Sequence, residues 1–183
     1  MDELTRLALA ARDGDRDALA AFVRRSQPDV WRFCAHAGDR GTADDLTQET
    51  FLRAIGSLRS FRAESNARTW LLSVAWRVCA DAVRRSRRQR AVFERFRAEV
   101  AEPVLRDPSG RVDLDELVGA LDADRRSAFV LTQVLGLSYD EAADVCGCPI
   151  GTIRSRVARA RVDLLRAAQA DDQRGTGTDR SGR

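Results

Sequence analysis

The sequence predicts an all-α protein made of two small helical domains joined by a flexible linker. Apolar residues recur at helical spacing along most of the 183 residues, and no run alternates apolar and polar residues as a half-buried strand would. Between residues 91 and 112 this spacing fades, and Pro, Gly, Ser and acidic residues gather as in linkers. We therefore expect one domain over residues 1–90 and a second over 113–169. Residues 170–183 have the composition of a disordered tail.

Four helices should build the first domain. They are expected over Leu4–Ala11, about residues 17–37, Thr42–Leu58 and from residue 66 to about Arg88. Ser65 or Asn66 can cap the fourth helix. The apolar spacing of the third helix predicts an inward face of Leu46, Thr50, Phe51, Ala54, Ile55 and Leu58.

The outward face of the third helix carries one leucine among polar side chains. Asp44 stands in the first helical turn, where an acidic side chain is favourable. The rest of this face comprises Asp45, Gln48, Glu49, Leu52 and Arg53. A single exposed leucine needs no explanation. Ringed by acids, an amide and an arginine, Leu52 also fits the anchor of a protein-binding surface.

The fourth helix carries Trp70, Arg77 and Arg84 along one flank, next to a polar loop. Aromatic rings and guanidinium groups suit unstacked bases, because they offer a π-face and a cation. Packing of Trp70 on the preceding helix is an equally good interpretation. The arginines near the end of this helix fit either a phosphate backbone or a solvated face.

A helix-turn-helix is predicted at about residues 138–161. Ser138 and Glu141 form a capping box, and Gly147 and Pro149 stop the first helix. The second helix opens near Gly151, with a buried stripe that leaves its polar and basic residues facing outward. Those that would face the major groove are Thr152, Arg154, Ser155, Arg156 and Arg159. The competing interpretation is two surface helices whose arginines are solvated.

Composition excludes several other classes of protein. The net charge is +3, and all basic residues are Arg, which indicates a G+C-rich coding sequence more than a function. No apolar run predicts membrane insertion and no signal peptide is visible, so we expect a cytoplasmic protein with reduced cysteines. The pairs Cys34/His36 and Cys146/Cys148 lack zinc-site spacing, so no metal or other cofactor is expected. One His, no phosphate-binding glycine loop and no nucleophile–base spacing argue against an enzyme, so no catalytic residue is assigned.

Three segments of the chain resemble one known family. Asp44–Ile55, Ala67–Arg85 and Leu135–Arg161 are similar, in order and spacing, to segments of the two-domain extracytoplasmic-function sigma factors of bacterial RNA polymerase. The resemblance implies that the chain directs the polymerase core to promoter DNA and aids strand opening. An anti-sigma factor is usual in the family, although no residue of this sequence identifies one.

The resemblance also assigns roles to the candidate residues. The outward face of the third helix would dock on the clamp helices of the β′ subunit through Asp44, Asp45, Gln48, Glu49, Leu52 and Arg53. The Phe61–Asn66 loop and the flank that follows would capture and melt the minus-ten element through Arg62, Ser65, Asn66, Arg68, Trp70, Arg77 and Arg84. The helix-turn-helix would read the minus-thirty-five element, and the acidic helices before it would contact the β flap. Which base the minus-ten loop captures stays open.

The alternative is a free-standing helix-turn-helix transcriptional regulator, with residues 1–90 as an effector or dimerisation domain. Such a regulator would bind duplex DNA tightly without polymerase, usually at a two-fold-symmetric site. A sigma factor would bind weakly alone and show no such symmetry. The exposed Leu52 surface and the Trp/Arg flank favour the sigma factor, because a repressor needs neither.

Overall fold

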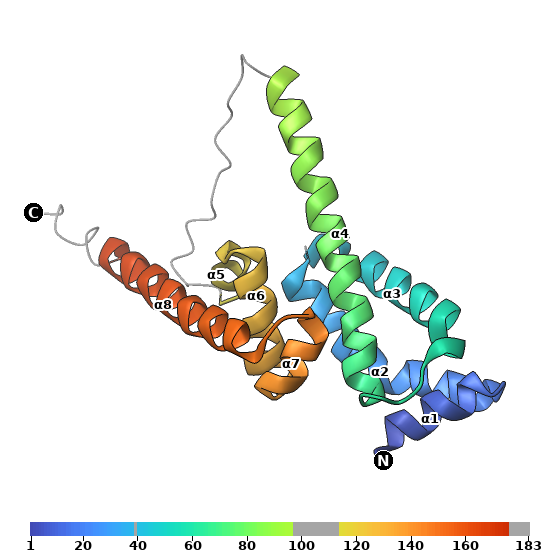
Figure 1. Cartoon of the computed structure of the whole chain (residues 1–183). Coiled ribbons are helices and arrows are strands. Elements are labelled where there is room, and N and C mark those ends of the chain that lie inside the picture. The colour runs from blue at the N-terminus through green and yellow to red at the C-terminus, as the bar shows by residue number, and fades with distance from the viewer. Residues whose placement is uncertain (39, 97–113, 176–183) are drawn as a thin grey trace, which may run out of the picture.

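The computed structural model describes residues 1–38, 40–96 and 114–175, and every regular element in these ranges is helical (Figure 1). In chain order the elements are α1 (Glu3–Arg12), α2 (Arg16–Ala37), η1 (Arg40–Thr42), α3 (Ala43–Ser57), η2 (Leu58–Ser60), α4 (Ala67–Phe96), α5 (Leu114–Ala120), α6 (Ala123–Phe129), η3 (Val130–Val134), α7 (Tyr139–Cys146) and α8 (Ile150–Gly175). None of the helices within these ranges is long and apolar enough to cross a bilayer.

Side-chain caps fix where the N-terminal helices begin. Asp2 accepts a hydrogen bond from the backbone of Thr5, and Asp15 accepts from the backbone of the first turn of α2. Asn66 accepts from the Thr69 amide at 2.8 Å, so Asn66 rather than Ser65 caps α4. Helices α2, α3 and α4 then pack together around fully buried side chains, among them Phe22, Val30, Phe33, Leu71 and Leu72.

The C-terminal half forms the predicted helix-turn-helix on a support of two further helices. The capping box of Ser138 and Glu141 is present, and Gly147 ends α7 in the left-handed conformation with φ 61°. Both predictions are therefore confirmed. Asp122 accepts from the Asp124 amide and so caps α6, and the chain then continues as a π-helical turn, η3.

Three details differ from the sequence-based expectation. Helix α4 continues to Phe96, since the residues after Arg88 include good helix formers and no Gly or Pro. Helix α8 likewise reaches Gly175, so residues 170–175 are helical rather than disordered; the expected linker from 97 on and the tail from 176 on lie outside the described residues. Ile55 was expected on the inward face but is 42% exposed. Successive residues of a helix point about 100° apart, so Ile55 points away from the direction in which its neighbour Ala54 is buried.

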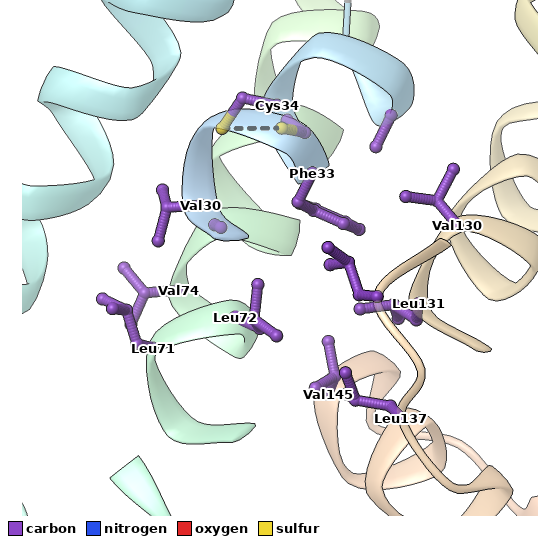
Figure 2. Packing of buried hydrophobic residues seen from close by; sticks show 14 of the residues in the cluster. Val30, Phe33, Cys34, Leu71, Leu72, Val74, Val130, Leu131, Leu137 and Val145 are labelled. Atoms are coloured by element: carbon purple, nitrogen blue, oxygen red, sulfur yellow. Dashed lines mark hydrogen bonds between the residues drawn. The ribbon is translucent and has the colours of Figure 1, made fainter. Parts of the chain in front are cut away.

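The two halves pack directly against each other. Phe33 of α2 and Leu72 of α4 belong to the same apolar cluster as Val130, Leu131 and Leu137 of the C-terminal half, and Figure 2 shows these side chains meeting. Helix α4 also contacts α7, and α2 contacts α5 and α6. A continuous apolar core therefore holds the two halves together in this structure.

Candidate nucleic-acid interface

The Phe61–Asn66 loop encloses a hollow next to α4. Ser60, the loop residues up to Ser65, and Trp70 line a space of about 360 Å³. Trp70 is half-buried, and its ring lies 4.9 Å from that of Phe61 at a tilt of 42°. Ala63 has a φ of 55°, in the region that non-glycine residues rarely adopt. The loop thus forms a defined concave surface, and Trp70 is one of its walls.

Two of the candidate minus-ten residues contact the other half of the chain. The Asn66 side-chain amide donates to Glu141 Oε1 at 3.0 Å. Arg68 donates through Nε to Asp29 Oδ2 at 2.7 Å, and through Nη2 to the Leu135 carbonyl at 2.7 Å. These side chains are therefore occupied in the packed arrangement of the two halves.

Glu141 links the helix-turn-helix to the loop. The backbone amide of Ser138 donates to the Glu141 carboxylate and holds the Glu141 pKa below its usual value. Burial of the carboxylate opposes this lowering. The Ser138 hydroxyl, Asn66 and Arg68 each lower the pKa further. One carboxylate thus serves both a helix cap and a contact between the two halves.

The three remaining minus-ten arginines are exposed, and Ser65 is not. Arg62 and Arg77 face solvent, and Ser65 is half-buried at the rim of the hollow. Arg84 is exposed and forms an ion pair with Asp81, which also binds Arg53 of α3. These arginines hold the Asp81 pKa below its usual value, with Arg84 the larger cause.

The candidate docking face on α3 is open to solvent. Leu52 is 61% exposed, so the outward orientation that the sequence predicted is confirmed. Asp45 and Gln48 are also exposed. Asp44 accepts a hydrogen bond from the Trp31 indole at 2.8 Å, and Arg53 pairs with Glu49 at 2.7 Å. Asp44, Glu49 and Arg53 are thus held by polar contacts on the face that exposes Leu52.

Helix α8, the candidate recognition helix, exposes two of its three candidate arginines to solvent. Ile153, Val157 and Ala160 are buried, whereas Arg154, Ser155 and Arg159 are exposed and Thr152 is half-buried. Arg156 differs, because it is also half-buried and forms an ion pair with Asp124 of α6.

Sequence reasoning missed the partners of these residues. Glu141, Asp29 and Asp124 each bind a candidate DNA-contacting side chain, but Glu141 lies 75 positions from Asn66 in the chain. No local spacing could have paired them.

The cysteines do not build a metal centre. Within the described residues no three His, Cys, Asp or Glu side chains gather as a metal site would need. The sulfurs of Cys34 and Cys79 lie 3.8 Å apart in the core, where Figure 2 shows the contact. The hydrogen bond with Cys34, followed by burial, raises the pKa of the Cys79 thiol.

Comparison with known proteins identifies the family. Residues 22–89 match the model of sigma-70 region 2, and residues 111–164 match that of sigma-70 region 4. The chain is 51% identical to the ECF RNA polymerase sigma factor SigC of Mycobacterium tuberculosis over 95% of its length and 96% of that protein. It is 35% identical to the ECF sigma factor EcfG of Rhodopseudomonas palustris, over 89% and 92%.

Two solved structures extend this likeness to the fold. CnrH, solved in complex with the cytosolic domain of CnrY, has a TM-score of 0.72 and 27% identity over 93% of this chain and 99% of that one. RpoE of Bartonella quintana, solved with the anti-sigma factor NepR, has a TM-score of 0.64 and 29% identity over 84% and 98%. These matches support a sigma factor and not the free-standing regulator. The chain belongs to the extracytoplasmic-function sigma factors of RNA polymerase.

Proposed function

We propose that this sigma factor brings RNA polymerase to promoters through three separate surfaces of the described chain. The α3 face around Leu52 docks on the clamp helices of the β′ subunit. The Phe61–Asn66 loop and the α4 flank capture and open the minus-ten element. Helix α8 reads the minus-thirty-five element, and helices α5 and α6 approach the β flap.

The hollow beside the minus-ten loop is the observation that carries the proposal. Its volume of about 360 Å³ is ample for a single flipped nucleobase, and Trp70 offers a ring on which a base can stack. Arg62 and Ser65 at its rim supply polar groups for the base edge and the phosphate. Base-specific enzymes use the same combination of an aromatic wall and polar rim when they take a base out of the stack.

Helix α8 is suited to duplex DNA. Its exposed Arg154 and Arg159 can bind guanine or phosphate, and the Ser155 hydroxyl can contact either kind of base. Arg156 must first leave Asp124, so its transfer to DNA exchanges one charged partner for another.

Promoter binding also requires the two halves to move apart. Asn66 and Arg68 are hydrogen-bonded to Glu141 and to the Leu135 carbonyl, which occupies donors that the minus-ten element would need. The α3 face takes no part in these contacts. In our proposal the packed form is therefore the free state, which binds DNA weakly and remains able to meet the polymerase.

The chain itself carries no chemistry in this proposal, since the polymerase performs nucleotidyl transfer. It acts in the cytoplasm, where the polymerase is found. An anti-sigma factor, like the one solved with the Bartonella relative, is a further partner that we propose for regulation.

In vitro transcription tests the proposal. The full chain is added to core polymerase on a library of genomic promoter fragments, and start sites are mapped by run-off transcription. We expect a discrete set of promoters to fire only when the chain is present, with permanganate-reactive thymines near the start site. Tight binding of the chain alone to symmetric duplexes, without start-site selection, would contradict it.

A further inference from the structure

Helix α1 lies outside the region 2 match, which begins at residue 22, yet it touches the loop that the proposed function uses. The helix packs on α2 and also contacts α4 and η2, the elements on either side of the Phe61–Asn66 loop. Two of its polar side chains, Thr5 and Arg12, reach the two ends of that loop.

Thr5 binds the C-terminal end of the loop. The Ala67 amide donates to the Thr5 hydroxyl at 2.9 Å, and both residues are almost fully buried. Ala67 is the first residue of α4, so its N–H has no acceptor within the helix. Thr5 therefore satisfies a donor that would otherwise be buried without a partner.

Asp2 orients the Thr5 hydroxyl. The hydroxyl donates to Asp2 Oδ2 at 2.6 Å, while Asp2 Oδ1 accepts from the Thr5 amide at 2.9 Å. With its proton committed to the carboxylate, the hydroxyl oxygen is left free to accept from Ala67. The contact is thus a chain of two hydrogen bonds whose direction the carboxylate fixes.

Arg12 binds the N-terminal end of the loop. Its Nη1 donates to the Phe61 carbonyl at 3.2 Å, and Asp13 holds the rest of the guanidinium through Nε at 2.9 Å. Phe61 is itself buried and packs against Trp70, the wall of the hollow. Helix α1 therefore holds the backbone of Phe61, the residue that packs against Trp70.

Between these two ends the loop has an unusual shape. Ala63 adopts a φ of 55°, a conformation that persists in non-glycine residues only when the surroundings enforce it. The hollow is lined by residues of this same stretch. Its shape therefore depends on how the ends of the loop are held.

We propose that Thr5 and Arg12 are positioning residues for promoter opening, because they hold Ala67 and Phe61 and so keep the hollow in the shape that receives a flipped base. This inference rests on the proposed function of the minus-ten loop. It assigns α1 a role in promoter melting without any contact to DNA.

The experiment compares Thr5→Val, Thr5→Ser and Arg12→Ala in the full chain. Valine keeps the shape of threonine but cannot accept from Ala67, whereas serine keeps the hydroxyl. Arg6→Ala is the matched control, since Arg6 is an exposed arginine of the same helix. Each variant is assembled with core polymerase on a promoter selected by the wild-type holoenzyme, and open complex is measured by permanganate reactivity relative to total promoter binding.

Leaving a buried donor or acceptor without its partner shifts an equilibrium by about fivefold to a hundredfold. We expect Thr5→Val and Arg12→Ala to lower the ratio of open to total complex within this range, with core binding unchanged. Thr5→Ser should restore opening, and Arg6→Ala should match wild type. Normal opening by both Thr5→Val and Arg12→Ala would overturn the proposal, and so would a failure of Thr5→Ser to restore opening.

Amide hydrogen exchange on the free chain separates this proposal from the function of the loop. Thr5→Val should lose protection at Ala67, and Thr5→Ser should retain it. If the wild-type holoenzyme opens no promoter, the function of the loop fails whatever exchange shows. If wild type opens promoters and the Ala67 amide is equally protected in Thr5→Val, the positioning role fails alone. Should Thr5→Val unfold, Arg12→Ala decides, because the Arg12 side chain is only half-buried.

Discussion

Replacing Leu52 with aspartate should strongly weaken binding to core polymerase while the fold survives. Leu52 is 61% exposed, so little buried apolar area is lost. Aspartate costs about 0.5 kcal/mol in helix propensity. Repulsion from Glu49, three residues earlier, adds about 0.2–0.5 kcal/mol. The folded state should therefore lose about 1 kcal/mol, a small part of the 5–15 kcal/mol, roughly, that stabilises an ordinary domain.

Binding should respond much more strongly than stability. An apolar anchor at the centre of an interface contributes about 2 kcal/mol or more, and a buried unpaired carboxylate adds to the loss. At about 1.4 kcal/mol per factor of ten, the dissociation constant for core polymerase should rise by roughly 30-fold or more.

Fluorescence anisotropy of labelled chain titrated with core polymerase measures this constant, and thermal unfolding measures the fold. Leu165→Asp is the matched control, because Leu165 is 63% exposed on α8, away from the α3 face. The reasoning fails if Leu52→Asp binds core polymerase as wild type does. It also fails if Leu165→Asp loses as much affinity, since any new surface charge would then explain the effect.

Further substitutions should also have measurable effects. Arg156→Ala should weaken selection of the minus-thirty-five element by about 1–3 kcal/mol in run-off transcription, and Asp124→Asn should strengthen duplex binding by freeing Arg156. Trp70→Ala should reduce permanganate reactivity of the bubble more than it reduces closed-complex binding. Ser138→Ala should cost about 1 kcal/mol of unfolding free energy. Because the folded pKa of Glu141 is depressed, its contribution is present above its ordinary value of 4.5 and is lost as pH falls through the folded pKa. Thermal unfolding between pH 3 and 7, roughly, should show this acid dependence, and Ser138→Ala should weaken it only slightly, because the backbone amide at position 138 is the larger cause and remains.

Local signals explain why the helix-turn-helix could be predicted from sequence. A capping box requires only Ser138 and Glu141, and a left-handed stop requires only Gly147, so neither depends on the rest of the fold. The outward orientation of Leu52 could also be predicted locally, because the apolar residues of its helix recur at strong helical spacing. Ile55 was assigned wrongly because a residue at the edge of a buried stripe is covered or exposed according to the neighbouring helix, which periodicity does not describe.

Contacts between distant residues could not be predicted. The bond from Asn66 to Glu141 and the bond from Ala67 to Thr5 each join residues more than sixty positions apart. Both depend on how whole helices pack. The resemblance to a family assigned the Phe61–Asn66 loop to the minus-ten element, but what holds the loop, and what occupies its polar groups, required the structure.

For the proposed surfaces, the exposed α3 face and the hydrogen-bonded Asn66 and Arg68 side chains imply an order of events. Separating the halves exposes apolar side chains such as Val130, Leu131 and Leu137, at a cost of roughly 4.5–9 kcal/mol if these three become fully exposed. The few polar contacts of a minus-ten element, at about 1 kcal/mol each, do not offset that cost alone. A large protein interface can offset that cost. Leu52 is accessible to a protein partner before the halves separate. Polymerase binding should therefore precede promoter recognition, and a free chain that bound promoter duplex as tightly as the holoenzyme does would refute this order.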